Sequence, residues 1–191
     1  VREHLDIPVI GVIDPVSREA AKHSKTRTIG VIGTRGTIRS DVYRRALDSV
    51  AEDLEVLQQP CPLLVPLAEE GWLEGDVVES IARSYLETFK GSDVDTLILG
   101  CTHYPILRDT LQLVANDILQ REVTLLDSGA PTASEIAGIL RELDLEQGGA
   151  EPAWLQFCAT DEPEQFSKTA GRFFGSELDD VEHVDLPVAT G

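Results

Sequence analysis

The stretch of the chain with the richest chemistry is the sequence GCTHYP at residues 100–105, which directly follows an apolar run. A thiol, a hydroxyl and an imidazole stand close together there, and Pro105 suits the first turn of a helix. A helix N-terminus favours thiolate over thiol, and His103 can serve as an acid–base partner. The spacing predicts proton-transfer or nucleophilic chemistry at Cys101. The alternative is a structural cysteine, since this residue type is among the most buried.

A second stretch, GTRGT at residues 33–37, follows another apolar run and offers the hydroxyls of Thr34 and Thr37. Together with the backbone N–H groups at the start of the next helix, they suit a small anion such as a carboxylate or phosphate. The stretch lacks the lysine of a P-loop and the glycine spacing of a dinucleotide site. The alternative is that Thr37 serves only as a helix N-cap.

A third stretch, residues 61–71, carries two prolines that predict an extended loop, followed by Glu69 and Glu70. One of these carboxylates can accept a proton or bind an ammonium group, and an exposed acidic turn is the alternative. Cys61 and Cys158 are interpreted as structural. The cysteines and histidines show no zinc-ligand spacing, so no metal site is expected.

The apolar pattern alternates between short β-rich runs and longer helical periods, which predicts an α/β fold with parallel sheets. The expected strands are residues 8–13, 28–33, 54–57, 96–100, 123–126 and 154–158. The expected helices are residues 15–24, 38–51, 75–90, 105–119, 131–143 and 162–174, with a capping box at Thr132. Sites in such folds lie at the carboxyl ends of the strands, where the three stretches above also lie.

Composition limits the possible partners of this 191-residue chain. Its net charge of −18, from 34 acidic and 16 basic residues, repels nucleic acid and anionic membranes, so neither is an expected partner. No apolar run approaches the length of a membrane span, and the first residues carry no secretory signal. Three widely spaced cysteines suit a reducing compartment, which predicts a cytoplasmic location.

Taken together, these stretches resemble the glutamate racemases of the aspartate/glutamate racemase superfamily. The resemblance rests above all on GCTHYP and covers essentially the whole chain. Other matching stretches are residues 7–13, 30–34 with Thr37, Ser40 and Tyr43, 61–67 with Glu69, 127–129, 132–135 and 173–175.

The resemblance implies racemisation of glutamate without a cofactor. In this reaction a thiolate removes the α-proton on one face and a thiol on the opposite face returns one. It assigns catalytic roles to Cys101, His103 and Glu69.

The same resemblance assigns substrate binding to Thr34, Thr37 and Thr102. It also implies that the substrate is a small molecule and that the enzyme supplies D-glutamate for peptidoglycan. A homodimer is one assembly that it allows.

The family fold implied is two similar three-layer α/β lobes with the site between them. Residues 15–123 would form the second lobe, and residues 1–14 with 124–191 would form the remaining part of an incomplete first lobe. The family's first Asp-Ser-Gly turn and its Ala-Cys-Asn-Thr segment, which carries the first catalytic cysteine, are not found in this sequence. We therefore expect a C-terminal fragment that is inactive alone.

Two other hypotheses remain open at this point. One is a racemase for aspartate or a hydantoin from the same superfamily. The other is a non-catalytic module that binds a carboxylate.

Overall fold

The computed structural model describes residues 7–149, 154–176, 178 and 180–186. The chain divides into two compact units, Val1–Glu146 and Gln147–Gly191. None of the described helices is long and apolar enough to cross a membrane.

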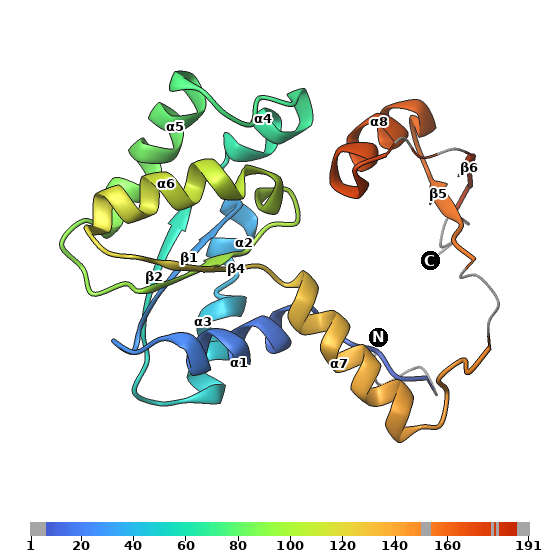
Figure 1. The fold of residues 1–191 in the computed structure, drawn as a ribbon, viewed down its shortest axis with the longest axis horizontal. Coiled ribbons are helices and arrows are strands. Elements are labelled where there is room, and N and C mark those ends of the chain that lie inside the picture. The colour runs from blue at the N-terminus through green and yellow to red at the C-terminus, as the bar shows by residue number, and fades with distance from the viewer. Residues whose placement is uncertain (1–6, 150–153, 177, 179, 187–191) are drawn as a thin grey trace, which may run out of the picture. The chain divides into compact units, whose positions relative to one another are not determined.

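The first unit is built on a parallel sheet of four strands in the order β2-β1-β3-β4 (Figure 1). The strands are β1 Thr28–Gly33, β2 Glu55–Pro60, β3 Thr96–Leu99 and β4 Thr124–Leu126. All residues of β1 and β3 are buried, as expected of central strands covered on both faces. The predicted strands in these four regions and the α/β fold class are confirmed.

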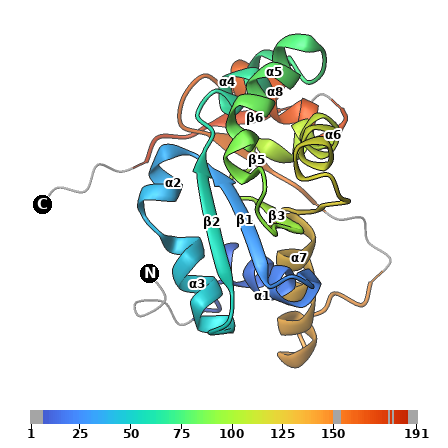
Figure 2. The same ribbon diagram turned by 90° about the vertical axis from the view of Figure 1, so that its left-hand side faces the viewer.

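Helices cover both faces of this sheet. One apolar cluster packs α1 and α3 against β1, and a second packs α4, α5 and α6 against the other face. Figure 2 shows α1 and α3 together at one side of the strands, and α5 with α6 at the other. The helices are α1 Ile13–His23, α2 Arg35–Arg39, α3 Val42–Val50, α4 Leu64–Glu70, α5 Asp76–Leu86, α6 Arg108–Leu119 and α7 Gly129–Glu142. Two short 3-10 helices are η2 Glu87–Phe89 and η3 Tyr104–Leu107.

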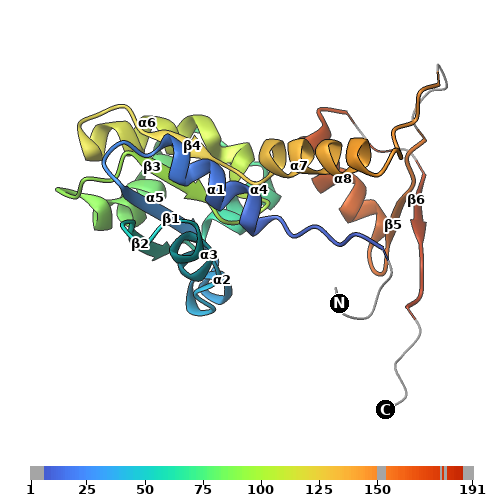
Figure 3. The ribbon, with the colours of Figure 1, turned by 90° about the horizontal axis from the view of Figure 1, so that it is seen from below.

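The second unit holds two short parallel strands, β5 Phe157–Ala159 and β6 Val181–His183, joined by α8 Pro163–Phe174 (Figure 3). The predicted helix at 162–174 is confirmed. The predicted strand at 154–158 was placed too early, because Trp154 and Leu155 are exposed and make no pairing with β6. Sequence reasoning missed β6, whose three residues carry too weak a pattern.

The prediction of a strand at residues 8–13 was wrong. Residues 8–11 are irregular, and α1 begins at Ile13. A strand needs a neighbour to satisfy its N–H and C=O groups, and no strand of the described part of the chain lies beside this segment.

The prediction of an extended loop between Cys61 and Gly71 was also wrong, because residues 64–70 form α4. Pro66 is the third residue of this helix, where its missing N–H is not needed for an intrahelical bond. Gly71, with φ of 76°, ends the helix in the left-handed conformation that glycine adopts at little cost.

Two further helix predictions need correction. The helix expected at 38–51 is interrupted at Asp41, whose φ of 52° separates α2 from α3. The expected capping box at Thr132 does not form, because α7 already begins at Gly129. The Thr132 hydroxyl therefore lies within the first turns of the helix, where it is buried and no described residue forms a hydrogen bond with it.

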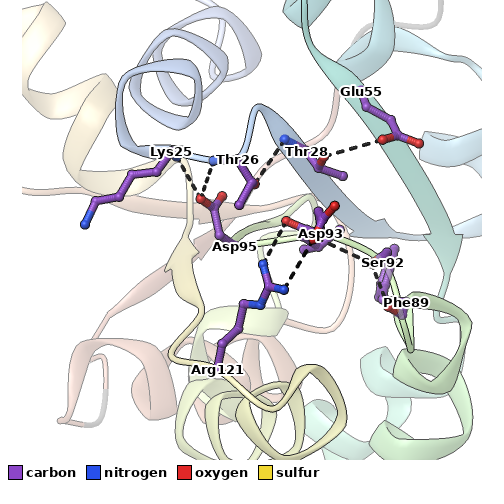
Figure 4. A network of polar contacts seen from close by, with 10 residues as sticks. Lys25, Thr26, Thr28, Glu55, Phe89, Ser92, Asp93, Asp95 and Arg121 are labelled. Carbon is purple, nitrogen blue, oxygen red and sulfur yellow. Dashed lines mark hydrogen bonds and ion pairs between the residues drawn. The ribbon is translucent and has the colours of Figure 1, made fainter.

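A polar network around Asp95 joins the start of β3 to the segment between α1 and β1 (Figure 4). The Asp95 carboxylate accepts hydrogen bonds from Ser24 Oγ at 2.8 Å and from the N–H groups of Lys25 at 2.7 Å and Thr26 at 2.9 Å. Burial raises the pKa of Asp95, but these bonds and one from Thr96 outweigh it, so the pKa is lowered. Asp95 therefore holds the start of β3 against the segment before β1, at the end of the sheet opposite the carboxyl ends of the strands.

We expect Asp95→Asn to lower the free energy of unfolding by about 2 kcal/mol, because it weakens several bonds to a charged acceptor. The neighbouring Asp93→Asn is the control, since Asp93 is exposed and forms only a 3.4 Å ion pair with Arg121. The control substitution should lower the free energy of unfolding by less than about 0.5 kcal/mol. Urea unfolding followed by circular dichroism measures both.

The same measurement has a pH dependence. Because the pKa of Asp95 is lower in the folded state, its contribution to the free energy of unfolding is complete above the unfolded pKa of about 3.9. It should disappear as the pH falls through the depressed folded value. Equal costs for the two variants at neutral pH would contradict the role given to Asp95.

Candidate active site

The carboxyl ends of β1, β2 and β3 meet at one edge of the sheet, where backbone contacts hold the three stretches together. The Gly100 N–H donates to the Ile32 carbonyl at 2.7 Å, and the Cys61 N–H donates to the Gly33 carbonyl at 2.8 Å. A Cβ on residue 100 would lie 2.8 Å from the Ile32 oxygen, so this approach requires glycine. Cys101 is thereby placed beside the end of β1.

The three predicted catalytic residues lie in a row. The Cys101 Sγ is 3.9 Å from His103 Nδ1, and His103 Nε2 is 3.5 Å from Glu69 Oε1. Cys101 and His103 come from the turn after β3, whereas Glu69 comes from the last turn of α4. A carboxylate beside one imidazole nitrogen orients the ring, which leaves the other nitrogen towards the thiol, as proton transfer requires.

The thiol of Cys101 is half-buried and its ionisation differs from the expectation. Burial raises its pKa, the N–H groups of His103 and Tyr104 lower it, and the Glu69 carboxylate raises it. The net pKa is raised, so the predicted bias towards thiolate was wrong. The helix-start amides act as expected, but desolvation of the thiolate is the larger effect. At neutral pH Cys101 is thus a proton donor, and it becomes a base only with help from His103.

The hydroxyl-rich loop after β1 adopts a compact form. Thr34 Oγ1 accepts a hydrogen bond from the Thr37 N–H at 3.2 Å and lies 3.0 Å from Thr37 Oγ1. Thr34 is therefore the N-cap of α2, and the alternative that assigned this role to Thr37 was wrong. Thr102 is exposed next to Cys101. The structure thus brings two of the predicted binding hydroxyls together and leaves the third open to solvent.

The other cysteines are separate from this row. Cys61 is fully buried, burial raises its pKa to about 12, and its carbonyl accepts a 2.8 Å hydrogen bond from the Tyr104 hydroxyl. Cys158 is an exposed residue of the second unit, so its interpretation as a structural residue buried within a strand was wrong. Cys61 therefore has the structural role that was predicted for it.

Residues 127–129 form the turn between β4 and α7. Asp127 accepts hydrogen bonds from the Gly129 N–H at 2.8 Å and from Arg108 Nη2 at 2.5 Å. Among the residues that the structure describes, no group of three or more acidic, histidine or cysteine side chains is arranged to hold a metal ion.

Sequence reasoning gave no functional role to Tyr43, which lies on α3 directly beneath the turn that holds Cys101. Its ring is 4% exposed, and a Cβ on Gly100 would lie 2.9 Å from ring atom Cε2. Helical spacing with Ala46 and Leu47 could have placed Tyr43 on the buried face of α3. No spacing along the sequence indicates that this face meets the turn after β3.

Comparison with known proteins agrees with this geometry. The sequence profile of the Asp/Glu/hydantoin racemase family matches residues 1–136. A glutamate racemase of Geobacter metallireducens is 42% identical over 186 residues, which cover 97% of this chain. The chain belongs to the Asp/Glu/hydantoin racemase family. The resemblance inferred from GCTHYP and the accompanying stretches is confirmed.

Solved structures of this family share the fold. A glutamate racemase isoform of Bacillus anthracis superposes with a TM-score of 0.87 at 37% identity, covering 98% of this chain and 68% of its own. A glutamate racemase of Francisella tularensis, solved in complex with D-glutamate, gives a TM-score of 0.83 at 32% identity, covering 94% of this chain and 65% of its own. The chain spans about two thirds of the length of the family members that it matches, including 67% of the Geobacter metallireducens relative.

The burial of the three thiols predicts different reactivities. In the folded chain, iodoacetamide should modify exposed Cys158 fastest and Cys101 more slowly, with Cys101 accelerating as the pH rises. Cys61 should react only on unfolding, because it is fully buried. Mass spectrometry of the separated peptides measures each rate. Modification of Cys61 at the rate of Cys101 in the folded protein would contradict this placement.

Proposed function

We propose that the protein carrying this chain interconverts D- and L-glutamate by proton transfer without a cofactor. The observation that carries this proposal is the row of Glu69, His103 and Cys101 beside the hydroxyls of Thr34 and Thr37. The family membership supports it, as do the names of the relatives and the D-glutamate bound to the Francisella tularensis protein.

The chemistry explains why these groups are needed together. The α-proton of an amino acid is very weakly acidic, so the carbanion that forms must be stabilised by donors around the carboxylate. In the proposal, Thr34, Thr37 and the adjoining N–H groups hold that carboxylate. The Cys101 thiol, with its raised pKa, gives its proton to one face of the carbanion and is left as thiolate.

In the reverse direction the Cys101 thiolate removes the proton from that face. His103, supported by Glu69, stabilises the thiolate and promotes its formation. Inversion also requires a second acid–base group on the opposite face of the α-carbon. Among the described residues of the first unit, Cys101 is the one thiol that is not fully buried, so it fills one of the two positions.

Three wider aspects remain proposals. We propose that residues 15–123, together with β4, which pairs with β3 in the same sheet, make one lobe of the enzyme and that residues 1–14 with 127–191 contribute to the other. We also propose that the product supplies peptidoglycan synthesis in the cytoplasm, and that the enzyme assembles as a homodimer. The names of the relatives support D-glutamate as a product that such a synthesis would use.

The decisive variant is Cys101→Ser in the complete protein. It should abolish racemisation, because one of the two opposed acid–base groups is lost. It should leave exchange of the α-hydrogen for deuterium in a single enantiomer, through the remaining group. Circular dichroism of the substrate and proton NMR in D2O measure the two reactions. Interconversion of both enantiomers at a near-normal rate would overturn the role of Cys101.

The carboxylate-binding role is tested by Thr34→Val and Thr37→Val in the complete protein. Each should lower kcat/KM by the equivalent of about 1.5–3 kcal/mol, the typical value of a hydrogen bond to a charged group. Thr26→Val, at the opposite edge of the sheet, is the matched control. If Thr34 and Thr37 behave like Thr26, the loop is only a helix cap.

The 191-residue chain by itself should not racemise glutamate, because it offers one open thiol at the site where two are needed. A coupled-enzyme assay with each enantiomer tests this, with Cys101→Ala as the control. Turnover by the chain above that of Cys101→Ala would show that a second acid–base group is already present.

A further inference from the structure

Tyr43 differs from the other two tyrosines of the chain in what its hydroxyl does. The Tyr104 hydroxyl donates to the Cys61 carbonyl at 2.8 Å, and the Tyr85 hydroxyl accepts from the Leu63 N–H at 3.3 Å. The Tyr43 hydroxyl makes no hydrogen bond within the described part of the chain. It is also not among the fully buried polar atoms that lack a partner there, so this oxygen keeps some contact with solvent.

The ring of Tyr43 occupies the space that fixes the turn after β3. Ring atoms Cε2 and Cζ would lie 2.9 and 3.3 Å from a Cβ on Gly100, and Cζ is the atom that bears the hydroxyl. The hydroxyl therefore lies close to the backbone that leads into Cys101. Electrostatic interaction between the two side chains agrees with this placement, because burial and then the Cys101 charge raise the pKa of Tyr43 to about 12.

The surroundings of Cys101 explain why such a donor matters. From α4, Glu69 opposes ionisation of the thiol, and burial opposes it more strongly. From its own turn, His103 lies 3.9 Å away, and the N–H groups of His103 and Tyr104 favour the thiolate. From α3, Tyr43 presents the hydroxyl that is not committed to another acceptor.

We propose that Tyr43 is a positioning residue for Cys101. Its buried ring holds the backbone of Gly100 against β1. Its neutral hydroxyl makes no hydrogen bond to the Cys101 thiol in this structure, and it turns to donate to the thiolate once the thiol has lost its proton. Tyr43 keeps its own proton throughout, so no covalent step is involved. This inference rests on the proposed function, because the ionisation of Cys101 matters for racemisation. It can nevertheless be tested without enzyme turnover, because the test measures only the ionisation of one thiol.

The test is the pH dependence of Cys101 alkylation by iodoacetamide in Tyr43→Phe, resolved by mass spectrometry of the Cys101 peptide. Removal of the hydroxyl should move the pH midpoint up by about half to one pH unit. Below the midpoint, the rate should fall about threefold to tenfold. Tyr85→Phe is the matched control, because it removes a tyrosine hydroxyl that bonds to Leu63, and it should leave the Cys101 profile unchanged. A purely structural ring would not move the midpoint.

A reciprocal measurement keeps the inference testable if Tyr43→Phe does not fold. In Cys101→Ala the midpoint of Tyr43 ionisation, followed by NMR of a carbon-13 label at Cζ, should fall below that of the unaltered chain. A Cys101 profile in folded Tyr43→Phe that superimposes on the unaltered chain overturns the proposal. An unchanged Tyr43 midpoint in Cys101→Ala also overturns it. If both midpoints move but the complete protein does not racemise glutamate, Tyr43 keeps this role and the proposed function fails.

Discussion

The hydrogen bond from the Gly100 N–H to the Ile32 carbonyl sets the position of every group at the candidate site. It continues the pairing of β1 and β3 by one residue beyond the strands and is possible only because residue 100 has no side chain. Cys101 then follows at the end of β3, at the same edge of the sheet as the loop after β1 that holds Thr34 and Thr37. The packing of helices on both faces of the sheet keeps that edge rigid.

The thiol is placed where its ionisation is unfavourable, and the neighbouring groups compensate in part. Burial and Glu69 oppose the thiolate, while two backbone N–H groups favour it. The contact between His103 and Glu69 gives the acidic residue a second effect, since a carboxylate on one imidazole nitrogen fixes the orientation of the ring that faces the thiol. The net effect favours the thiol over the thiolate, which suits a group that gives a proton.

The sequence predicted best what is encoded locally. Continuous apolar runs indicated β1 and β3, and GCTHYP indicated the turn with Cys101 and His103. Residues 64–70 were missed as α4 because the prolines suggested an extended segment, although a proline in the first turn does not break a helix. The contacts of His103 with Glu69, and of Tyr43 with Gly100, join elements far apart in the chain. No periodicity or spacing encodes such contacts, and only the family resemblance distinguished Glu69 from the neighbouring Glu70.

The most direct test of the account is where glutamate binds. Amide NMR spectra of the isotope-labelled chain, titrated with D-glutamate, locate the contact without requiring turnover. The account predicts shifts at residues 34–37 and 101–103, at the carboxyl edge of the sheet, and none around Asp95 at the opposite edge. Shifts centred on the Asp95 edge, or an edge around Cys101 that does not respond while other surfaces do, would contradict it.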